Sequence, residues 1–260
     1  MITNNIWLGT WTLGGMGFGP NPNKSPHSII LKAISNGITC FDTAGVYAKG
    51  QSECILANAL RTVSRSDVFI SSKGGLYWDG NNVLHDASPS SLRQACYESL
   101  DRLKTDYLDL YSLHWPDPSV SVVDSVNELL SLYHEGVIRH IGVCNFTIDE
   151  LSQIKALDLD CVVFHQVHHN MMHRSDSILT YARHIKNIIN VAYSPVEQGL
   201  LVRKPRHINS DATFAKLFRV SSLNPFYDAM SWVLNDDLVD VVISGSRTLS
   251  QLNELCRLIK

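Results

Sequence analysis

Four polar residues stand at or just after the early apolar segments of the chain: Asp42, Tyr47, Lys73 and His114. A tyrosine phenol has a pKa of about 10, so it keeps its proton at neutral pH. A nearby lysine ammonium stabilises the phenolate and lowers that pKa, and an aspartate can hold the lysine in place. An imidazole can hydrogen-bond a substrate oxygen and orient it. Together, these side chains could protonate a carbonyl oxygen while another group attacks its carbon.

Each of the four residues also has an ordinary structural explanation. Asp42 could cap a turn or a helix, and Lys73 could lie on the surface. His114 could be a hydrogen-bonded core histidine, and Tyr47 could simply pack a loop. The sequence offers no activated serine or cysteine nucleophile. The chemical interpretation therefore depends on whether the fold brings the four together.

Short apolar segments alternate with amphipathic ones along the whole chain. The predicted strands span residues 6–8, 39–41, 68–71, 108–113, 138–143, 162–167, 188–193 and 241–244. The predicted helices span residues 26–35, 52–60, 88–103, 120–133, 148–157, 177–184, 225–234 and 250–258. Strands this short and continuously apolar are typical of a parallel sheet covered on both faces.

Eight strand–helix units in about 250 residues are the usual content of an α/β (β/α)8 TIM barrel, although an open doubly wound sheet fits the same alternation. No proline-rich or charged linker divides the chain, so we predict a single domain over residues 1–260. Barrel active sites form at the carboxyl ends of the strands. Seven consecutive predicted strand ends carry polar or reactive groups: Asp42, Lys73, His114, Cys144 with Asn145, Gln166, Tyr193 with Ser194, and Gly245 with Ser246 and Arg247.

The composition argues against several classes of protein. The net charge of -3 gives no electrostatic case for binding nucleic acid or an anionic membrane. No apolar run approaches the ~18–20 residues of a membrane span, and no basic-then-apolar leader opens the chain. The six cysteines are scattered without a C-x-x-C pair, as buried free thiols are. We therefore expect a cytoplasmic protein.

A cluster of histidines raises the alternative of a metal-dependent barrel hydrolase. It consists of His165, His168, His169 and His173. The first part of the cluster falls on a predicted strand, where alternation sends neighbouring side chains to opposite faces. No carboxylate lies among the histidines in the sequence. We therefore predict no metal site.

Motifs distributed over nearly the whole chain resemble those of the aldo-keto reductase superfamily, in the family order. They are LGTW (8–11), FDTAGVY (41–47), GQSE (50–53), SK (72–73), DLYSLHWP (109–116), IGVCNF (141–146), Gln166, AYSP (192–195), GLL (199–201) and ISGSR (243–247). The resemblance implies an oxidoreductase that uses NAD(P) on a (β/α)8 barrel. It places the catalytic tetrad on Asp42, Tyr47, Lys73 and His114, with Tyr47 as the general acid.

The resemblance also implies a cofactor site and a substrate pocket. The cofactor-binding positions fall on Cys144, Asn145, Gln166, Tyr193, Ser194, Gly199, Leu200, Gly245, Ser246, Arg247 and Gln251. Arg247 stands at the start of the last helix, where a guanidinium suits the 2′-phosphate of NADP, so NADP(H) is favoured over NAD(H). Trp11 and Trp115 match aromatic positions of the pocket. Position 144 usually holds serine, and cysteine is a weaker hydrogen-bond donor.

The chain is short for this superfamily, with little room for the usual N-terminal hairpin and C-terminal loop. We therefore expect a more open substrate site. The expected reaction reduces an aldehyde or ketone, which could be a sugar or a sugar derivative, and the reverse reaction oxidises an alcohol. The same features leave open a non-catalytic nicotinamide-binding subunit that acts as a redox sensor. Substrate, direction and oligomeric state, monomer or homo-oligomer, are not determined by the sequence.

Overall fold

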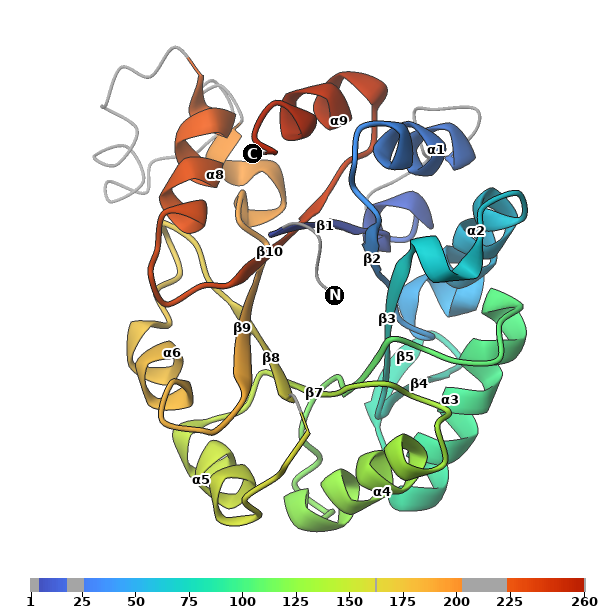
Figure 1. Ribbon diagram of the computed structural model, residues 1–260, viewed down its shortest axis with the longest axis vertical. Coiled ribbons are helices and arrows are strands. Elements are labelled where there is room, and N and C mark those ends of the chain that lie inside the picture. Colours follow the sequence, from blue (N-terminus) through green and yellow to red (C-terminus); the bar gives the residue numbers. More distant parts are fainter. Residues whose placement is uncertain (1–4, 18–25, 162, 203–223, 260) are drawn as a thin grey trace.

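Eight parallel strands close into a barrel in the computed structural model, which describes residues 5–17, 26–161, 163–202 and 224–259 (Figure 1). Each strand pairs with its neighbour along the chain, and the last pairs with the first. The barrel strands are β1 (Ile6–Gly9), β2 (Cys40–Asp42), β3 (Phe69–Gly74), β6 (Leu110–Leu113), β7 (Ile141–Cys144), β8 (Val163–His168), β9 (Ile188–Tyr193) and β10 (Val241–Gly245). Closure confirms the predicted (β/α)8 barrel and excludes the open doubly wound sheet.

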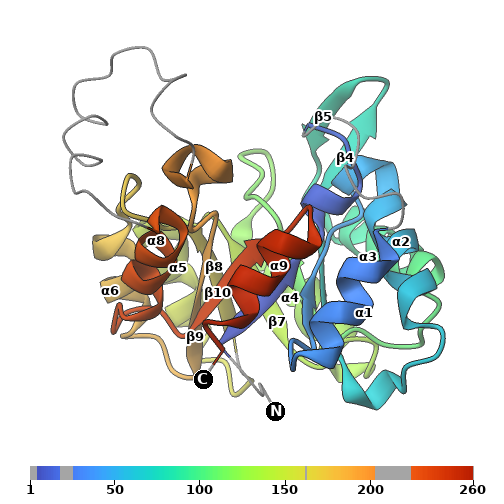
Figure 2. The same ribbon diagram turned by 90° about the horizontal axis from the view of Figure 1, so that it is seen from above.

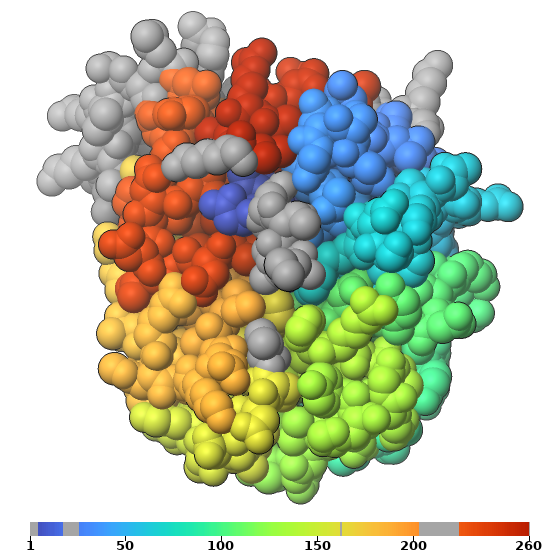
Figure 3. All heavy atoms as spheres, in the orientation of Figure 1, coloured from blue at the N-terminus to red at the C-terminus, as the bar shows by residue number. Residues whose placement is uncertain are grey.

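A ring of α-helices surrounds the barrel (Figure 1). The described helices are α1 (His27–Ser35), α2 (Gln51–Leu60), α3 (Pro89–Leu103), α4 (Val122–His134), α5 (Ile148–Ala156), α6 (Asp176–Ala182), α8 (Pro225–Leu234) and α9 (Leu249–Cys256). In the space-filling view, the sequence colours follow one another around the molecule, as they must when each unit packs beside the next (Figure 3). No helix in the described ranges is both long and apolar enough to cross a bilayer.

The alternation of side chains along each strand decides which residues enter the barrel. A packed apolar layer contains Trp7, whose ring lies 4.9 Å from that of Phe69 and 5.7 Å from that of Phe164. Two residues further along these strands, the same face carries Ser71 and Gln166. The intervening residues face the helices and form the larger core between the barrel and its outer ring. The polar groups at the carboxyl ends of the strands therefore lie directly on this apolar layer.

A two-stranded hairpin was not predicted. Its strands β4 (Leu76–Asp79) and β5 (Asn82–His85) pair only with each other and follow β3 at its carboxyl end. The hairpin extends away from the barrel (Figure 2). Gly80, with φ of 60°, and Asn81 form its two-residue turn. Gly-Asn between two apolar segments is a recognised hairpin signal, but it does not belong to the strand–helix alternation of the chain.

Short 3-10 helices complete the described chain: η1 (Trp11–Leu13), η2 (Tyr47–Gly50), η3 (Arg65–Asp67) and η4 (Glu197–Val202). Three of them follow barrel strands at the carboxyl ends, namely η1 after β1, η2 after β2 and η4 after β9. They carry Trp11, Tyr47 and Leu200, so much of the predicted site depends on loop geometry. In the described chain, β1 is the first element and α9 is the last, so neither an N-terminal hairpin nor a C-terminal loop is seen there.

Candidate active site

A buried ion pair joins β2 to β3 at their carboxyl ends. The Nζ atom of Lys73 lies 2.6 Å from Oδ1 of Asp42, and both side chains are almost fully buried. The same ammonium donates to the backbone carbonyl of Thr43 at 2.9 Å. The other carboxylate oxygen of Asp42 accepts hydrogen bonds from Ser71 Oγ and Gln166 Nε2, each at 3.2 Å. These contacts hold the lysine in one place.

Tyr47 receives the remaining hydrogen bond from this lysine. Lys73 Nζ donates to the Tyr47 hydroxyl oxygen at 3.3 Å, which leaves the hydroxyl proton free to be donated elsewhere. The imidazole of His114 meets the phenol ring edge-on at 5.6 Å, and the Trp11 ring stacks on it at 5.9 Å. Strands β2, β3 and β6 thus bring together all four residues of the predicted tetrad.

Burial controls the acidity of Tyr47 more than the neighbouring lysine does. Loss of solvent raises the pKa of the phenol, and the Lys73 cation only partly reverses this, so the net pKa is about 12. We had expected the lysine to lower it. Desolvation prevails because a phenolate loses most of its hydration at this depth, while the lysine charge is shared with Asp42. Tyr47 therefore remains a proton donor over the whole neutral range.

His114 is held as a neutral imidazole. Burial lowers its pKa well below the ordinary value, and repulsion from the Lys73 cation lowers it further. The Nδ1 atom is buried and has no hydrogen-bond partner among the described residues. The backbone carbonyl of His114 accepts a hydrogen bond from Asn145 Nδ2 at 3.0 Å, which ties this loop to the next strand end. A neutral ring can hydrogen-bond a substrate oxygen without competing for its proton.

Trp11 and Trp115 flank this group of residues. Their side chains are 38% and 41% exposed, so both indoles present apolar surface to the solvent at the barrel mouth. The Trp115 ring also contacts His85 of the hairpin, at 6.5 Å between centroids. The open substrate site stays a prediction.

Amide side chains and a tyrosine ring lie beside the tetrad on β7, β8 and β9. Tyr193 donates its hydroxyl to Asn145 Oδ1 at 2.7 Å, so the phenol ring is held across the barrel mouth. Gln166 uses Nε2 on Asp42, and its Oε1 accepts no hydrogen bond from a described residue. Burial raises the pKa of the Cys144 thiol to about 12, so it stays protonated and is a poor donor.

Two stacked imidazole rings pack against one face of the Tyr193 ring. This stack was not predicted from the sequence. The imidazole of His168 lies 5.2 Å from the Tyr193 ring at 14°, and His173 stacks on His168 at 4.1 Å. His168 Nε2 hydrogen-bonds Glu197 Oε2 at 2.7 Å. Asn170 donates to the same carboxylate oxygen at 2.6 Å. The signal in the sequence is the density of histidines, which raises only the alternative of a metal site that we do not predict.

The residues assigned to the phosphate side of the cofactor lie on two neighbouring loops. Ser194 and Gly199 have φ angles of 55° and 92°, and Leu200 is 39% exposed. On the other loop, Gly245 and Ser246 lead into α9.

Helix α9 begins with a capping box. Gln251 Oε1 accepts from the backbone N–H groups of Arg247 and Thr248, at 2.8 and 3.2 Å, and Thr248 Oγ1 accepts from Gln251 N. This capping box occupies the backbone N–H groups of Arg247, Thr248 and Gln251.

The family model for the aldo/keto reductase family matches residues 5–260, which is almost the whole chain. The chain belongs to the aldo/keto reductase family. It is 32% identical over 282 aligned residues to an aldo-keto reductase of Bacillus subtilis, covering 97% of this chain and 84% of that protein. It is 34% identical to the NADH-specific methylglyoxal reductase of Escherichia coli, over 76% of this chain and 65% of that protein.

Solved structures of aldo-keto reductases superpose on the barrel. A glycerol dehydrogenase from Gluconobacter oxydans aligns with a TM-score of 0.81 and 27% identity, over 97% of this chain and 85% of that one. An aldo/keto reductase from Klebsiella pneumoniae, in complex with NADP and acetate, aligns with a TM-score of 0.75 and 26% identity, over 97% and 84% of the two chains. This family member is therefore an oxidoreductase of the (β/α)8 type.

The histidine cluster of this aldo/keto reductase does not converge on one point. His165 faces outward and contacts Asn190 at 3.2 Å, whereas His168 and His169 contact Glu197 and Asp236. No carboxylate lies among the histidines in the sequence, but the fold brings Glu197 and Asp236 to them. Among the described residues, His169, Asp176 and Asp236 are close enough to share an ion. His169 already hydrogen-bonds Asp236 through Nε2 and accepts from Ser175 N through Nδ1, so both ring nitrogens are in use.

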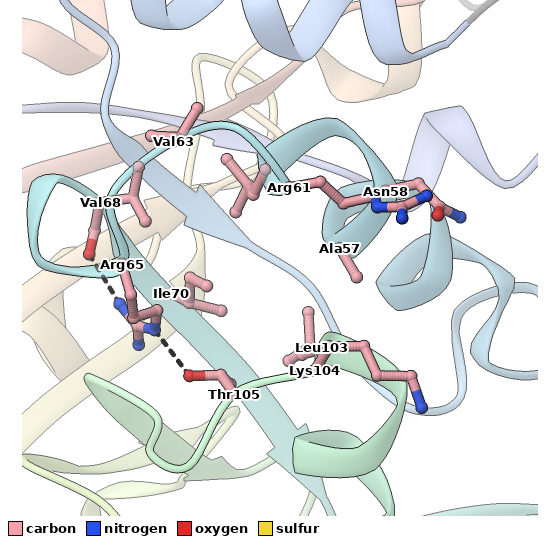
Figure 4. A pocket seen from close by; sticks show the side chains of 11 residues that line it. Ala57, Asn58, Arg61, Val63, Arg65, Val68, Ile70, Leu103, Lys104 and Thr105 are labelled. Carbon is pink, nitrogen blue, oxygen red and sulfur yellow. Dashed lines mark hydrogen bonds between the residues drawn. The ribbon is translucent and has the colours of Figure 1, made fainter.

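A cavity of about 560 Å³ lies away from the tetrad, between the ends of α2 and α3 at the amino-terminal end of β3 (Figure 4). Arg65 at its wall is held by the Val68 carbonyl and Thr105 Oγ1, each at 2.9 Å, and by Asp109 at 2.6 Å. Its charge thus links framework segments of the reductase. We assign this cavity no role in the chemistry.

Proposed function

We propose that this aldo/keto reductase reduces an aldehyde or ketone with NADPH, using Tyr47 as the general acid. The observation that carries the proposal is the hydrogen-bond chain from Asp42 through Lys73 to the Tyr47 hydroxyl, with the neutral His114 ring beside it. Such a chain can place a proton at a defined point and stabilise the anion left behind. The completeness of this set favours an enzyme over a non-catalytic nicotinamide-binding subunit.

The bound nicotinamide supplies the hydride that reaches the carbonyl carbon. Tyr47 gives its hydroxyl proton to the carbonyl oxygen, and the ammonium of Lys73 stabilises the phenolate that remains. Asp42 keeps the lysine charged and oriented. His114 orients the same oxygen by a hydrogen bond, which adds electrostatic stabilisation where negative charge develops. Solvent returns a proton to Tyr47, and the reverse sequence oxidises an alcohol.

The residues at the ends of β7, β8 and β9 fit a nicotinamide group. Gln166 has an amide oxygen with no described partner, and Asn145 carries a second amide, which together suit a carboxamide. The Tyr193 ring is half-buried, and His168 supports it on one face. Stacking on its other face suits a flat heteroaromatic ring. We assign Cys144 to the same carboxamide, and Ser194, Gly199, Leu200, Gly245, Ser246 and Gln251 to the phosphate and adenosine side.

The substrate class is best tested by a panel. Relatives include a methylglyoxal reductase and a glycerol dehydrogenase, so small oxygenated carbonyl compounds are the first to try. Oxidation of NADPH should be measured with aldehydes, ketones and keto-sugars, and repeated with NADH. We expect turnover with at least one class and a higher kcat/KM with NADPH. A lack of turnover across the panel, together with intact NADPH binding, would support the redox-sensor alternative.

Replacement of Arg247 by alanine should weaken NADPH binding about tenfold or more and leave NADH binding unchanged. A charge-assisted hydrogen bond to the 2′-phosphate contributes about 1.5–3 kcal/mol, and NADH lacks that phosphate. Isothermal titration with both cofactors measures the effect. Arg257→Ala, at the other end of α9, is the control and should change neither affinity. If the NADPH affinity stays at its wild-type value, or if both affinities fall together, Arg247 does not recognise the 2′-phosphate.

A further inference from the structure

The loop that carries Tyr47 has a backbone that it cannot hold by itself. Ala48 and Lys49 have φ angles of 50° and 54°, and Gly50 follows with 85°. Non-glycine residues seldom adopt the left-handed region, because the Cβ atom approaches the following carbonyl oxygen. Two of them in succession directly after the proposed acid persist only where surrounding contacts over-determine them. Contacts from outside the loop must therefore hold this conformation.

The β4–β5 hairpin holds the loop on both sides of Tyr47. The indole N–H of Trp78 donates to the backbone carbonyl of Val46 at 2.8 Å. On the other side, Lys49 Nζ donates to the carbonyl of Gly80 at 2.8 Å and lies 5.1 Å from the centre of the Trp78 ring. Val46, directly before Tyr47, and Lys49, two positions after it, are thus both bound to the hairpin. Each of these hydrogen bonds joins a side chain to a backbone carbonyl, so substitution of Trp78 or Lys49 removes it.

The other end of the hairpin is bound to the loop that carries His114. His85 Nδ1 hydrogen-bonds the carbonyl of Pro116 at 3.1 Å, and Asp117 Oδ2 accepts from Ala87 N at 3.3 Å. The hairpin therefore spans the loops of the proposed acid and of the orienting imidazole. It stands at the barrel mouth, outside the closed sheet (Figure 2).

The burial of the hairpin argues against a role in the core. Every residue of β5 is exposed, and along β4 the exposure alternates, with Leu76 and Trp78 half-buried and Tyr77 and Asp79 exposed. Only one face of β4 thus turns toward the protein, and Trp78 on that face reaches the Tyr47 loop. A hairpin with so little buried surface contributes little to the stability of the barrel. The hydrogen bonds of the hairpin described above go to the loops that carry Tyr47 and His114.

We propose that Trp78 and Lys49 are positioning residues, which hold the strained loop of residues 46–50 and so fix the Tyr47 hydroxyl relative to Lys73 and His114. The inference rests on the proposed function in that Tyr47 is the acid. The Lys73–Tyr47 hydrogen bond, at 3.3 Å, is long, so a small shift of the loop breaks it. Displacements of about 1 Å in a catalytic group can lower a rate as much as 10²-fold.

The test replaces Trp78 with phenylalanine, which keeps an aromatic ring and removes the indole donor. Tyr77→Phe is the matched control, since it removes a polar group from the exposed face of the same strand. Amide hydrogen exchange reports on the loop directly, because the N–H groups of Tyr47 and Lys49 donate to Ala44 and Val46 within it. We expect exchange in residues 44–50 to accelerate about tenfold in Trp78→Phe and not in Tyr77→Phe.

Kinetics supply the second readout. In Trp78→Phe, kcat should fall about tenfold while the NADPH dissociation constant stays within about twofold, because the ties act on the acid and not on the cofactor. Lys49→Met removes the donor and the cation but keeps the apolar stem, and should show the same pattern more weakly. Lys49→Arg, which restores a donor, should recover much of the loss.

Two outcomes would overturn the inference. If exchange in residues 44–50 stays at the wild-type rate in both Trp78→Phe and Lys49→Met, the hairpin does not hold the loop, whatever happens to kcat. If exchange accelerates but kcat of an active wild-type enzyme is unchanged, the loop does not position the acid. Should the wild type reduce no carbonyl compound, the proposed function fails, while the exchange experiment still decides whether the loop is held.

Discussion

Replacing Tyr47 with phenylalanine is expected to lower kcat for carbonyl reduction by about 10²–10⁴-fold, the range that a positioned general acid contributes. The variant keeps the ring that stacks on Trp11 and meets His114, and it removes only the hydroxyl that Lys73 contacts. Cofactor binding should stay within about twofold, because Tyr47 is assigned to the substrate and not to the nicotinamide. Steady-state rates and NADPH titration measure both quantities.

The pH dependence offers a check on the same residue. Because the pKa of Tyr47 is raised to about 12, the acid form needed for reduction is present throughout pH 6–9, and kcat for reduction should stay flat there. Alcohol oxidation needs the phenolate, so its rate should rise with pH over the same range. Tyr227→Phe, on the exposed surface of α8, is the control and should leave both profiles unchanged. Substantial reductase activity in Tyr47→Phe would assign the proton to another group.

Replacing Lys73 with methionine is expected to abolish reduction and to lower the free energy of unfolding by about 3 kcal/mol or more. The lysine side chain has no exposed surface, and its removal leaves the buried carboxylate of Asp42 without its cation. Urea denaturation measures the stability, provided that the m-value is unchanged. Lys186→Met breaks the exposed ion pair with Asp160 and should have no measurable effect.

A second substitution separates the structural effect from the chemical one. The double variant Asp42→Asn/Lys73→Met carries no buried charge at this pair, so it should regain much of the lost stability and stay inactive. The Asp42 carboxylate raises the pKa of Lys73 despite burial. The charged lysine therefore makes its full contribution to stability at pH values below about 10.4, which is its pKa in the unfolded chain. This contribution is lost as the pH rises through the pKa that the lysine has in the folded protein. If the double variant is less stable than Lys73→Met, the buried charge is not the source of the loss.

The strand–helix alternation allowed most of the barrel to be predicted. Each predicted strand overlaps a barrel strand, and Ile188–Tyr193 has the predicted bounds. Several strands extend one to three residues further than predicted, as β3 does to Gly74, because polar site residues such as Lys73 belong to the strand and break the apolar pattern. The β4–β5 hairpin was missed, since it lies outside the alternation and buries little surface. Its Gly80–Asn81 turn was visible in the sequence.

The candidate tetrad could be named from the sequence, because residue types at strand ends and a family resemblance both pointed to it. The electrostatics of the tetrad could not be predicted from the sequence. The expected lowering of the Tyr47 pKa by Lys73 is outweighed by burial, and burial depends on neighbours from several strands. The pairing of Asp42 with Gln166, which lie 124 residues apart, is likewise a product of barrel closure.

The sequence by itself determined the barrel and the identity of the polar groups at its carboxyl ends, because strand periodicity and residue type are local properties. Only the tertiary structure decided how these groups act. Closure of the barrel buried the Asp42–Lys73 pair and aimed the lysine at Tyr47. It also placed His168 behind Tyr193 and the hairpin against the strained Tyr47 loop. Those contacts join segments that are distant in the chain, so their geometry follows from packing and not from any local pattern.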